Sequence, residues 1–538
     1  MAASIAFEVD GAAVEVPDDG ASLLEVLRYR LGLRSAKDGC SPQGQCGCCT
    51  VLVDGAPRVA CVTPARRLAG RRVTTVEGLP ADERACWADA FVATGASQCG
   101  FCTPGIVVRL SGLAARGVEV DDTAAVERAL AAHLCRCTGW RTIVDAWRLA
   151  LTGPPSRSGL QTGAKTASLR RPEGDVSAGR DLDAASVRAA IEGGVRQRVG
   201  PDVVLGGGGF ADDTAPDGAL VAVPDGSGRP GGWAVGESLS EARAAAGKVQ
   251  GRRTTIEARH PLDVPPGHWD LRLRTSWVEP AYLETDASWC EPGGAPVTPL
   301  ANGGAFGSKL TSPVAPVARR LADEHGRPVR VLLSREDVVR LGPKRPPMAA
   351  GIRADGTGVL RVVRTPGIAA AIAAAAPGLD VEEVDVAGPP TSAQLRAAGW
   401  AEALVMLTAA AGRQPVTVIS PAGATASAEI DEGAIRVRVD CGDPLDQVVL
   451  RSYCIGAVHM ALGWVRREAI AVDAAGVPHD LTIRSFAILT ASEMPEVEVE
   501  IVSGDGPPVN GSDAVFTAVA AAEWMRQDCP QDWPTGRT

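Results

Sequence analysis

The chain has 538 residues and a formal net charge of −10, so we expect two to four domains and no basic face for nucleic acid. Hydrophobic residues make up 45% and charged residues 22%, which excludes a wholly disordered chain. The 61 glycines follow no Gly-X-Y period, which excludes collagen.

The first ten residues carry no basic group ahead of an apolar stretch, unlike a secretory or transit signal. The longest apolar run, residues 367–376, is too short to cross a bilayer. We therefore expect a cytoplasmic protein, in which disulfides are rare. Eight of the 14 cysteines lie between residues 40 and 102, and such clustering with short gaps indicates metal binding.

Residues 1–80 are predicted to form a β-grasp ferredoxin-like domain. Alternation predicts a strand over 5–9, and Asp10-Gly11 predicts a hairpin turn into a second strand over 13–16. Leucines 23, 24, 27 and 31 share one helix face behind Ser22. A Gly-rich cysteine loop then precedes a strand over Thr50–Val53.

The rest of the chain is predicted as an α+β multidomain arrangement. Residues 81–152 form a compact four-helix domain, with helices over 82–94, 103–116, 123–133 and 140–151. Residues 153–178 are a Gly-, Ser- and Pro-rich linker. Residues 179–538 are a mixed α/β region, with strands over 329–333 and 435–439 and helices over 316–324, 394–411 and 514–526. Pro316 suits the first position of its helix.

Two groups of cysteines have the composition of metal sites. The first is CSPQGQCGCC from Cys40, followed by Cys61; we assign Cys40, Cys46, Cys49 and Cys61 as ligands and treat Cys48 as an extra thiol. The second group is Cys99, Cys102, Cys135 and Cys137, on two turns between helices. Four thiolates suit either zinc or a [2Fe–2S] cluster. The Gly-rich loop of the first group and the Cys-x-Cys of the second favour iron–sulfur.

The segments QCGFCTPG (98–105) and LCRCTG (134–139) closely resemble the sequence signatures of the xanthine oxidase family of molybdenum hydroxylases. The resemblance runs through about the first 150 residues. It implies two [2Fe–2S] clusters on the eight cysteines, with the helical one nearer the molybdenum. It also implies that Gln98 lies beside the pterin of the molybdenum cofactor.

The C-terminal half resembles that family's molybdopterin-binding subunit in shortened form. The loop NGGAFGSK (302–309) resembles the family's Gly-Gly-x-Phe-Gly loop, and LRAAG (395–399) resembles its Phe-Arg-Gly-x-Gly segment. The resemblance thereby implies cofactor contacts from Gly304, Phe306, Gly307 and Arg396. Glu279 and Glu284 flank a segment similar to one on the family's substrate side, but lone carboxylates are more often solvated.

This half also departs from the family. It has about half the family's length, and the Gly-Gln-Gly region that grips the pterin has no counterpart. The family's catalytic glutamate falls on Gly511-Ser512-Asp513, where only Asp513 could act as a general base. The family's flavin domain is also missing, so FAD is expected on a partner chain.

Three hypotheses follow. In the first, the chain is an iron–sulfur electron-transfer component that relays single electrons from a molybdenum centre to a partner flavin, with FAD-binding and molybdopterin-binding subunits as partners. In the second, the chain itself binds molybdopterin and hydroxylates a heterocycle or aldehyde, with Asp513 as the base. In the third, it is a redox sensor or cluster-binding interaction module.

Overall fold

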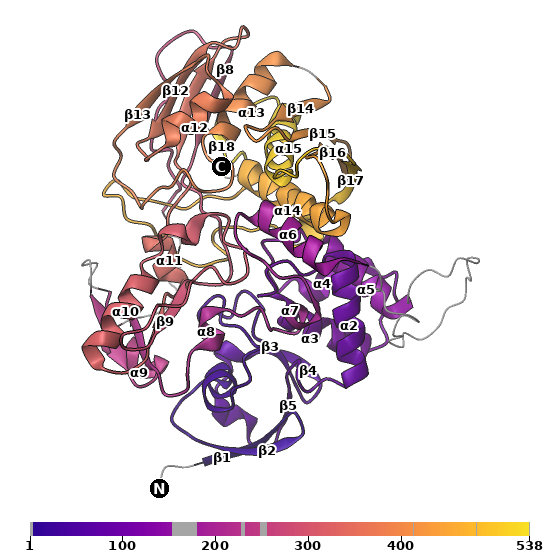
Figure 1. Cartoon of the computed structure of the whole chain (residues 1–538), viewed down its shortest axis with the longest axis vertical. Coiled ribbons are helices and arrows are strands. Elements are labelled where there is room, and N and C mark those ends of the chain that lie inside the picture. Colours follow the sequence, from indigo (N-terminus) through magenta and orange to yellow (C-terminus); the bar gives the residue numbers. More distant parts are fainter. Residues whose placement is uncertain are drawn as a thin grey trace.

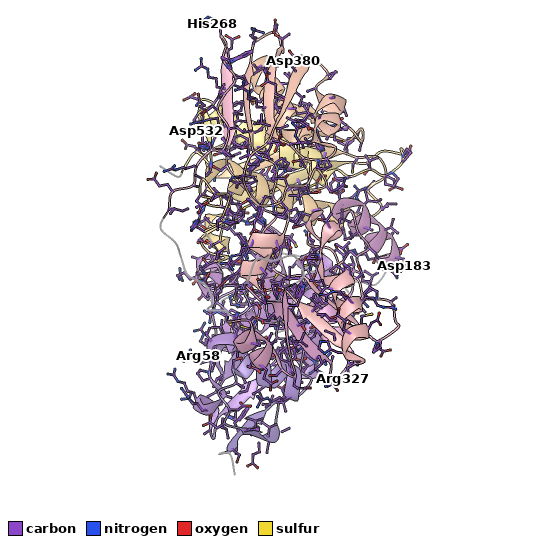
Figure 2. All side chains as sticks on the ribbon, turned by 90° about the vertical axis from the view of Figure 1, so that its left-hand side faces the viewer. Arg58, Asp183, His268, Arg327, Asp380 and Asp532 are labelled. Atoms are coloured by element: carbon purple, nitrogen blue, oxygen red, sulfur yellow. The ribbon has the colours of Figure 1, made fainter. Side chains whose placement is uncertain are left out.

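The computed structural model describes residues 4–152, 180–226, 232–247, 256–412, 414–479 and 481–536. Its described residues form a mixed α/β multidomain fold, as predicted, with four sheets (Figure 1). Charged side chains such as Arg327 and Asp380 project from its periphery (Figure 2). The linker predicted over 153–178 lies outside the described residues.

The N-terminal sheet has the strand order β2-β1-β5-β3-β4. The turn Asp10-Gly11 joins β1 to β2, and both its residues have positive φ (51° and 83°), as a two-residue hairpin turn requires. Ser22 caps the predicted helix by accepting from the Glu25 amide at 3.2 Å. The bounds are β1 Ser4–Val9, β2 Ala12–Pro17, α1 Leu23–Glu25, the π-helical turn η1 Val26–Arg30, β3 Thr50–Val53, β4 Ala56–Val59, the 3-10 turns η2 Ala60–Val62 and η3 Ala65–Leu68, and β5 Arg72–Thr74.

Four helices follow, where the sequence predicts four. Asp122 begins α4 by accepting from the Ala125 amide at 2.8 Å, and Gly95 ends α2 in the left-handed conformation (φ 69°). Trp87 and Trp147 stack between α2 and α5 with ring centroids 6.2 Å apart. The bounds are α2 Ala81–Thr94, α3 Thr103–Ala114, α4 Thr123–Leu130 and α5 Arg141–Thr152.

The middle of the chain forms a four-stranded sheet in the order β7-β6-β10-β9, beside the N-terminal part (Figure 1). The helix predicted from Pro316 begins earlier, at Val314. Pro316 is thus its third residue, where an amide still has no intrahelical partner. The bounds are α6 Leu182–Gly193, α7 Pro201–Val204, α8 Ala211–Thr214, β6 Leu220–Pro224, β7 Trp233–Gly236, α9 Leu239–Ala245, β9 Ala287–Cys290, the 3-10 turn η4 Ser308–Thr311, α10 Val314–His325, β10 Val329–Leu332 and α11 Arg335–Leu341.

The C-terminal part holds two more sheets, β13-β12-β11-β8-β18 and β14-β15-β16-β17. The helix predicted over 394–411 is wrong for residues 394–399: only Trp400–Ala411 is helical. The bounds are β8 Leu271–Thr275, β11 Met348–Ile352, β12 Gly358–Val363, α12 Ile368–Ala375, β13 Leu379–Val384, α13 Trp400–Ala411, β14 Val416–Ile419, β15 Thr425–Ile430, β16 Ala434–Asp440, α14 Gln447–Arg466, the 3-10 turn η5 Ala491–Glu493, β17 Glu496–Val502, α15 Ser512–Arg526 and β18 Asp532–Trp533.

Helix α14 is the central element of this part. Within the described residues it is the one helix long and apolar enough to cross a bilayer, but 89% of its apolar window is buried inside the protein. It packs against α15, α6 and the helix α2 of the N-terminal half. The C-terminal half therefore packs directly on the helical part of the N-terminal half.

Candidate functional site

The first cysteine group lies in the loop before β3 and at the start of η2. Cys40 forms thiol hydrogen bonds with Cys46 and Cys61, and Cys61 forms one with Cys49. All four side chains are buried. Because Cys46 and Cys61 both donate to it, the pKa of the Cys40 thiol is well below its usual range. The four predicted ligands are thus brought together.

Backbone amides point at the sulfurs of this group. The amides of Gln43 and Gln45 donate to Cys40 Sγ at 3.2 and 3.4 Å, and the Cys61 amide donates to Cys49 Sγ at 3.4 Å. Such N–H···S bonds hold cluster thiolates and tune cluster potentials. The extra thiol of Cys48 points to the Cys46 carbonyl, 3.9 Å away, and also forms a thiol hydrogen bond with Cys46.

The second group lies where α3 begins and just ahead of α5. Its four thiols form two pairs, Cys99 with Cys137, whose sulfurs are 3.7 Å apart, and Cys102 with Cys135. Because Cys102 donates to it, the pKa of the Cys135 thiol falls to about 6. Each pair joins one cysteine from the turn at 97–102 to one from the turn at 134–139.

The paired arrangement bears on the choice of metal. In the part of the chain that the structure describes, no group of three or more His, Cys, Asp or Glu side chains is arranged to hold one metal ion. A structural zinc needs four ligands around one point. A [2Fe–2S] cluster instead takes two protein ligands on each of its two irons. The two thiol pairs of the second group match that two-by-two arrangement.

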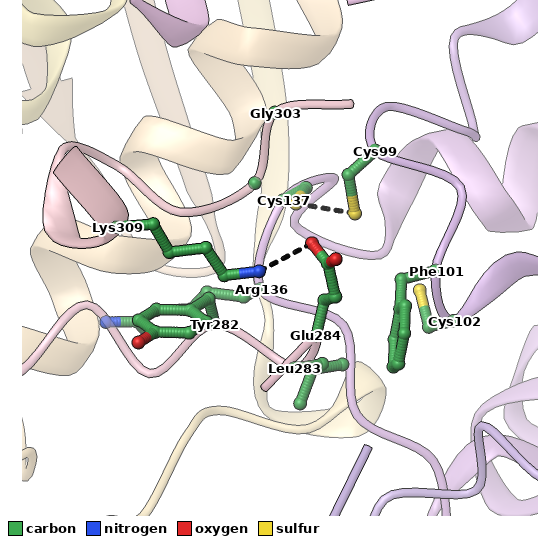
Figure 3. A pocket seen from close by; sticks show the side chains of 11 residues that line it. Cys99, Phe101, Cys102, Arg136, Cys137, Tyr282, Leu283, Glu284, Gly303 and Lys309 are labelled. Carbon is green, nitrogen blue, oxygen red and sulfur yellow. Dashed lines mark hydrogen bonds and ion pairs between the residues drawn. The ribbon is translucent and has the colours of Figure 1, made fainter. Parts of the chain in front are cut away.

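A small cavity of about 10 Å³ adjoins the second group (Figure 3). Lys309 reaches into it from the C-terminal half and pairs with Glu284 at 2.7 Å. Burial raises the pKa of Glu284 to about 7, and Lys309 opposes that rise. The expectation that Glu284 and Glu279 are solvated is wrong: both are buried, and Glu279 pairs with Arg335 and Lys344.

The Gly-rich loop at 302–307 reaches the cysteines. A Cβ at Gly304 would lie 2.9 Å from Cys99 Cβ and 3.1 Å from its sulfur, so only glycine allows this approach. Phe306 and Gly307 both have positive φ (50° and 87°), and a Cβ at Gly307 would lie 1.9 Å from the Gln394 carbonyl. The loop therefore packs on protein on both sides.

Two further predicted residues, Arg396 and Asp513, are brought together, but they hold each other. Arg396 Nε donates to Asp513 Oδ1 at 2.8 Å, and its Nη2 donates to the buried Ser512 hydroxyl. Burial raises the pKa of Asp513 above its usual value, although the Arg396 guanidinium opposes that rise. The guanidinium of Arg396 also lies 5.6 Å from the centre of the Phe306 ring. A carboxylate bound in this way is poorly placed to take a proton from elsewhere.

Gln98 is also bonded within the chain. Its Nε2 donates to the Cys137 carbonyl at 3.0 Å and to Ser452 Oγ at 2.9 Å. Both donor hydrogens of the amide are thereby used. The residue predicted to face a pterin thus joins the second cysteine group to α14.

Sequence reasoning missed Arg136, which stands between Cys135 and Cys137. Its guanidinium forms two parallel bonds to Glu468, one of them 2.7 Å long, and its Nε donates to the Pro280 carbonyl at 2.8 Å. Both side chains are at most 3% exposed. No sequence signal links residues 136 and 468, because the contact is made only in the folded chain.

The comparisons with known proteins agree with this geometry. A family model described as "[2Fe-2S] binding domain" matches residues 75–148. The chain is 42% identical over 136 residues to the aldehyde oxidoreductase of Megalodesulfovibrio gigas, a stretch that is 24% of this chain and 14% of that protein. It is 41% identical over 128 residues to the xanthine dehydrogenase iron-sulfur-binding subunit of Escherichia coli O157:H7, covering 23% of this chain and 79% of that subunit.

The fold comparison extends to the whole chain. The crystal structure of the aldehyde oxidoreductase from Desulfovibrio desulfuricans ATCC 27774 superposes with a TM-score of 0.65 at 14% identity, covering 97% of each chain. At that identity the match shows the fold alone. Together with the iron–sulfur matches, it shows that the chain belongs to the xanthine oxidase family of molybdenum hydroxylases, a family of oxidoreductases.

Proposed function

We propose that this chain is the iron–sulfur electron-transfer component of a xanthine oxidase-type assembly. The single observation that carries the proposal is the gathering of eight cysteines into two four-thiol groups in adjoining loops. A Cβ at Gly105, in the helix after Cys102, would lie 2.5 Å from the Gly47 carbonyl in the first loop. The two groups are thus separated by little more than packed backbone.

The eight cysteines would divide into two sets of cluster ligands. Cys40, Cys46, Cys49 and Cys61 would hold one [2Fe–2S] cluster, and Cys99, Cys102, Cys135 and Cys137 the other. When bound, such clusters carry single electrons. The amides of Gln43, Gln45 and Cys61 would stabilise the thiolates of the first site, and burial of every cysteine of the two groups except the partly buried Cys99 would limit the access of water.

The relatives favour partner subunits. The relatives from Escherichia coli O157:H7 and from Eubacterium barkeri are named an iron-sulfur-binding subunit and a small FeS subunit, respectively. By the same logic this chain would pass electrons between a molybdenum centre and an FAD-binding subunit. Its C-terminal half would act as a scaffold, joined to the second cysteine group by the buried pair of Arg136 and Glu468.

The alternative of a self-contained hydroxylase meets residues that do not fit molybdopterin. Arg396 and Asp513 are paired with each other, and Gln98 is bonded within the chain. The cavity lined by Phe306, Arg396 and Arg136 measures about 30 Å³, room for about two water molecules.

The test is the iron content and redox spectrum of the full chain, purified without oxygen. About four irons per chain and two distinct EPR signals after reduction with dithionite would support the proposal. A Cys102→Ala variant should lose one signal and about two irons while keeping the other. Zinc in place of iron, or iron without any reducible signal, would refute an electron-transfer role. Redox activity that needs no flavin partner would favour the sensor hypothesis instead.

A further inference from the structure

The family resemblance assigns a specific space to the pterin, bounded by Gln98, the Gly-rich loop and the Gly511–Asp513 segment. In this chain the helix α6 and the residues after it lie in that space. Figure 1 shows α6 against α14. Its contacts reach each boundary in turn.

The first boundary is the beginning of α15. The carboxylate of Glu192, on α6, accepts hydrogen bonds from the amides of Gly511 and Ser512 at 3.0 and 2.9 Å. Asn510 donates to the carbonyls of Ile191 and Glu192 at 3.3 and 3.0 Å. A helix N-terminus favours an anion, and here the chain's own carboxylate supplies it. An anionic cofactor group could bind these amides only by displacing Glu192.

Glu192 is itself fixed. It is 4% exposed and pairs with Arg188, one turn earlier on the same helix, whose guanidinium also donates to the Val509 carbonyl at 2.6 Å. Arg188 Nη2 further lies 3.3 Å from Cys441 Sγ. Removing either partner would leave an unpaired buried charge, which is strongly destabilising. The helix is therefore firmly bound.

The second boundary is the Gly-rich loop, which meets the residues after α6. A Cβ at Gly303 would lie 2.4 Å from Gln197 Oε1, so the loop packs directly on that side chain. The Arg198 amide donates to Asn302 Oδ1 at 2.8 Å, and Asn302 Nδ2 donates to the Cys99 carbonyl at 3.0 Å. This chain of bonds joins the segment to the second cysteine group.

The third boundary is the side near Gln98. Tyr453 of α14 donates its hydroxyl proton to Gln197 Oε1, and the neighbouring Ser452 accepts from Gln98. The cavity left between Gln98, Gln197 and Tyr453 measures about 10 Å³. That is room for about one water molecule.

We infer that α6 and the segment as far as Arg198 take the place of molybdopterin, so that this family member binds none. Glu192 supplies the anion at the start of α15, Gln197 meets the Gly-rich loop, and Gln98 bonds to α14. The inference concerns cofactor content only, and it holds or fails independently of the proposed electron-transfer role.

The test compares the full chain from two hosts, one that makes molybdopterin and is supplied with molybdate, and one that cannot make the cofactor. Molybdenum and released pterin are measured beside iron. Hydrogen–deuterium exchange is followed over residues 182–198 and 511–526. We expect no molybdenum or pterin in either preparation, and the same slow exchange of both segments in each.

Glu192→Gln provides the second arm, with Asp183→Asn as the matched control. Asp183 is an exposed carboxylate on the same helix (Figure 2). Glu192→Gln should speed exchange at least tenfold in both α6 and the first turn of α15, because the two share that carboxylate, whereas Asp183→Asn should change neither. Should Glu192→Gln fail to fold, Tyr453→Phe, which loses only the bond to Gln197, takes its place, with faster exchange expected around residue 197.

Each outcome decides the inference. Molybdenum or pterin at about one per chain in the first host would overturn it, even if four irons and both cluster signals were present. Exchange of α6 that is fast in the wild-type chain would also overturn it, because a segment that fills the groove must be protected. Loss of iron alone would count against the electron-transfer role and leave this inference standing.

Discussion

The amide of Leu134 donates a 2.9 Å hydrogen bond to the carbonyl of Cys46. Leu134 directly precedes Cys135 of the second cysteine group, and Cys46 belongs to the first. The bond therefore joins the two cysteine loops backbone to backbone. Beside it, Thr50 Oγ1 contacts His133 Nε2 at 3.1 Å. The relative position of the two groups is set by main-chain contacts, which hold it more rigidly than flexible side chains would.

Gly105→Ala should disturb both cysteine groups at once. Its new Cβ would fall 2.5 Å from the Gly47 carbonyl and 2.8 Å from that of Cys48, and backbone atoms cannot move aside cheaply. We expect a loss of about 1–3 kcal/mol in the free energy of unfolding. EPR signals of both clusters should change, and a change in the second alone would contradict rigid coupling. Gly112→Ala is the control on the same helix, because its Cβ would meet only the Leu52 side chain, at 3.0 Å.

Substitutions at Cys48 and Cys49 should have opposite effects. Cys49→Ala removes a thiol bonded to Cys61 and should abolish the first cluster, with about two irons lost per chain. Cys48→Ala removes a thiol that contacts Cys46 but is not among the four assigned ligands, so both clusters should remain. Iron analysis and EPR of the two variants measure the difference. If Cys48→Ala lost the first cluster and Cys49→Ala kept it, the ligand assignment would have to be exchanged.

The sequence predicts the N-terminal half well because its signals are local. Turn glycines, capping residues and apolar periodicity place α2 to α5 within a few residues of their ends, and Asp122 caps α4 as its residue type allows. The cysteine motifs likewise consist of neighbours in the sequence. The local structure that such short-range patterns predict depends little on long-range contacts.

The C-terminal half is harder to predict because long-range contacts decide it. Residues 394–399 have helical composition, yet Ala397 and Gly399 take positive φ (54° and 84°), and the Arg396 amide donates to the Phe306 carbonyl at 3.2 Å. Glu284 is buried because Lys309 faces it. Glu192 carries no motif at all, and only the folded chain brings it to α15.

Glu468→Gln should destabilise the junction between the halves. It leaves Arg136 charged and buried without its partner, which costs about 3–5 kcal/mol. The uncompensated positive charge beside Cys135 and Cys137 should also favour the reduced form of the second cluster and raise its potential. Thermal unfolding and a redox titration measure the two effects.

Glu237→Gln is the control, because Glu237 forms an exposed pair with Arg327. It should change neither the stability nor the potential of the second cluster. An unchanged second-cluster potential in Glu468→Gln would contradict electrostatic coupling.

Buried His459 should make the fold sensitive to mild acid. Burial lowers its pKa to about 3, and in the described structure its Nδ1 has no hydrogen-bond partner that could stabilise a proton there. An unfolded chain takes up that proton near pH 6.5, so protonation favours the unfolded state as the pH falls below 6.5. Between pH 7 and pH 5 this one residue should remove about 2 kcal/mol from the free energy of unfolding.

His459→Gln tests this effect. Its side-chain amide keeps a donor for the Leu489 carbonyl, which lies 3.0 Å from Nε2 of His459, but it cannot titrate. Denaturant unfolding at the two pH values should therefore show a smaller loss of stability in this variant. His268→Gln, at an exposed site, should keep the wild-type loss, and equal losses in all three proteins would mean that His459 does not contribute.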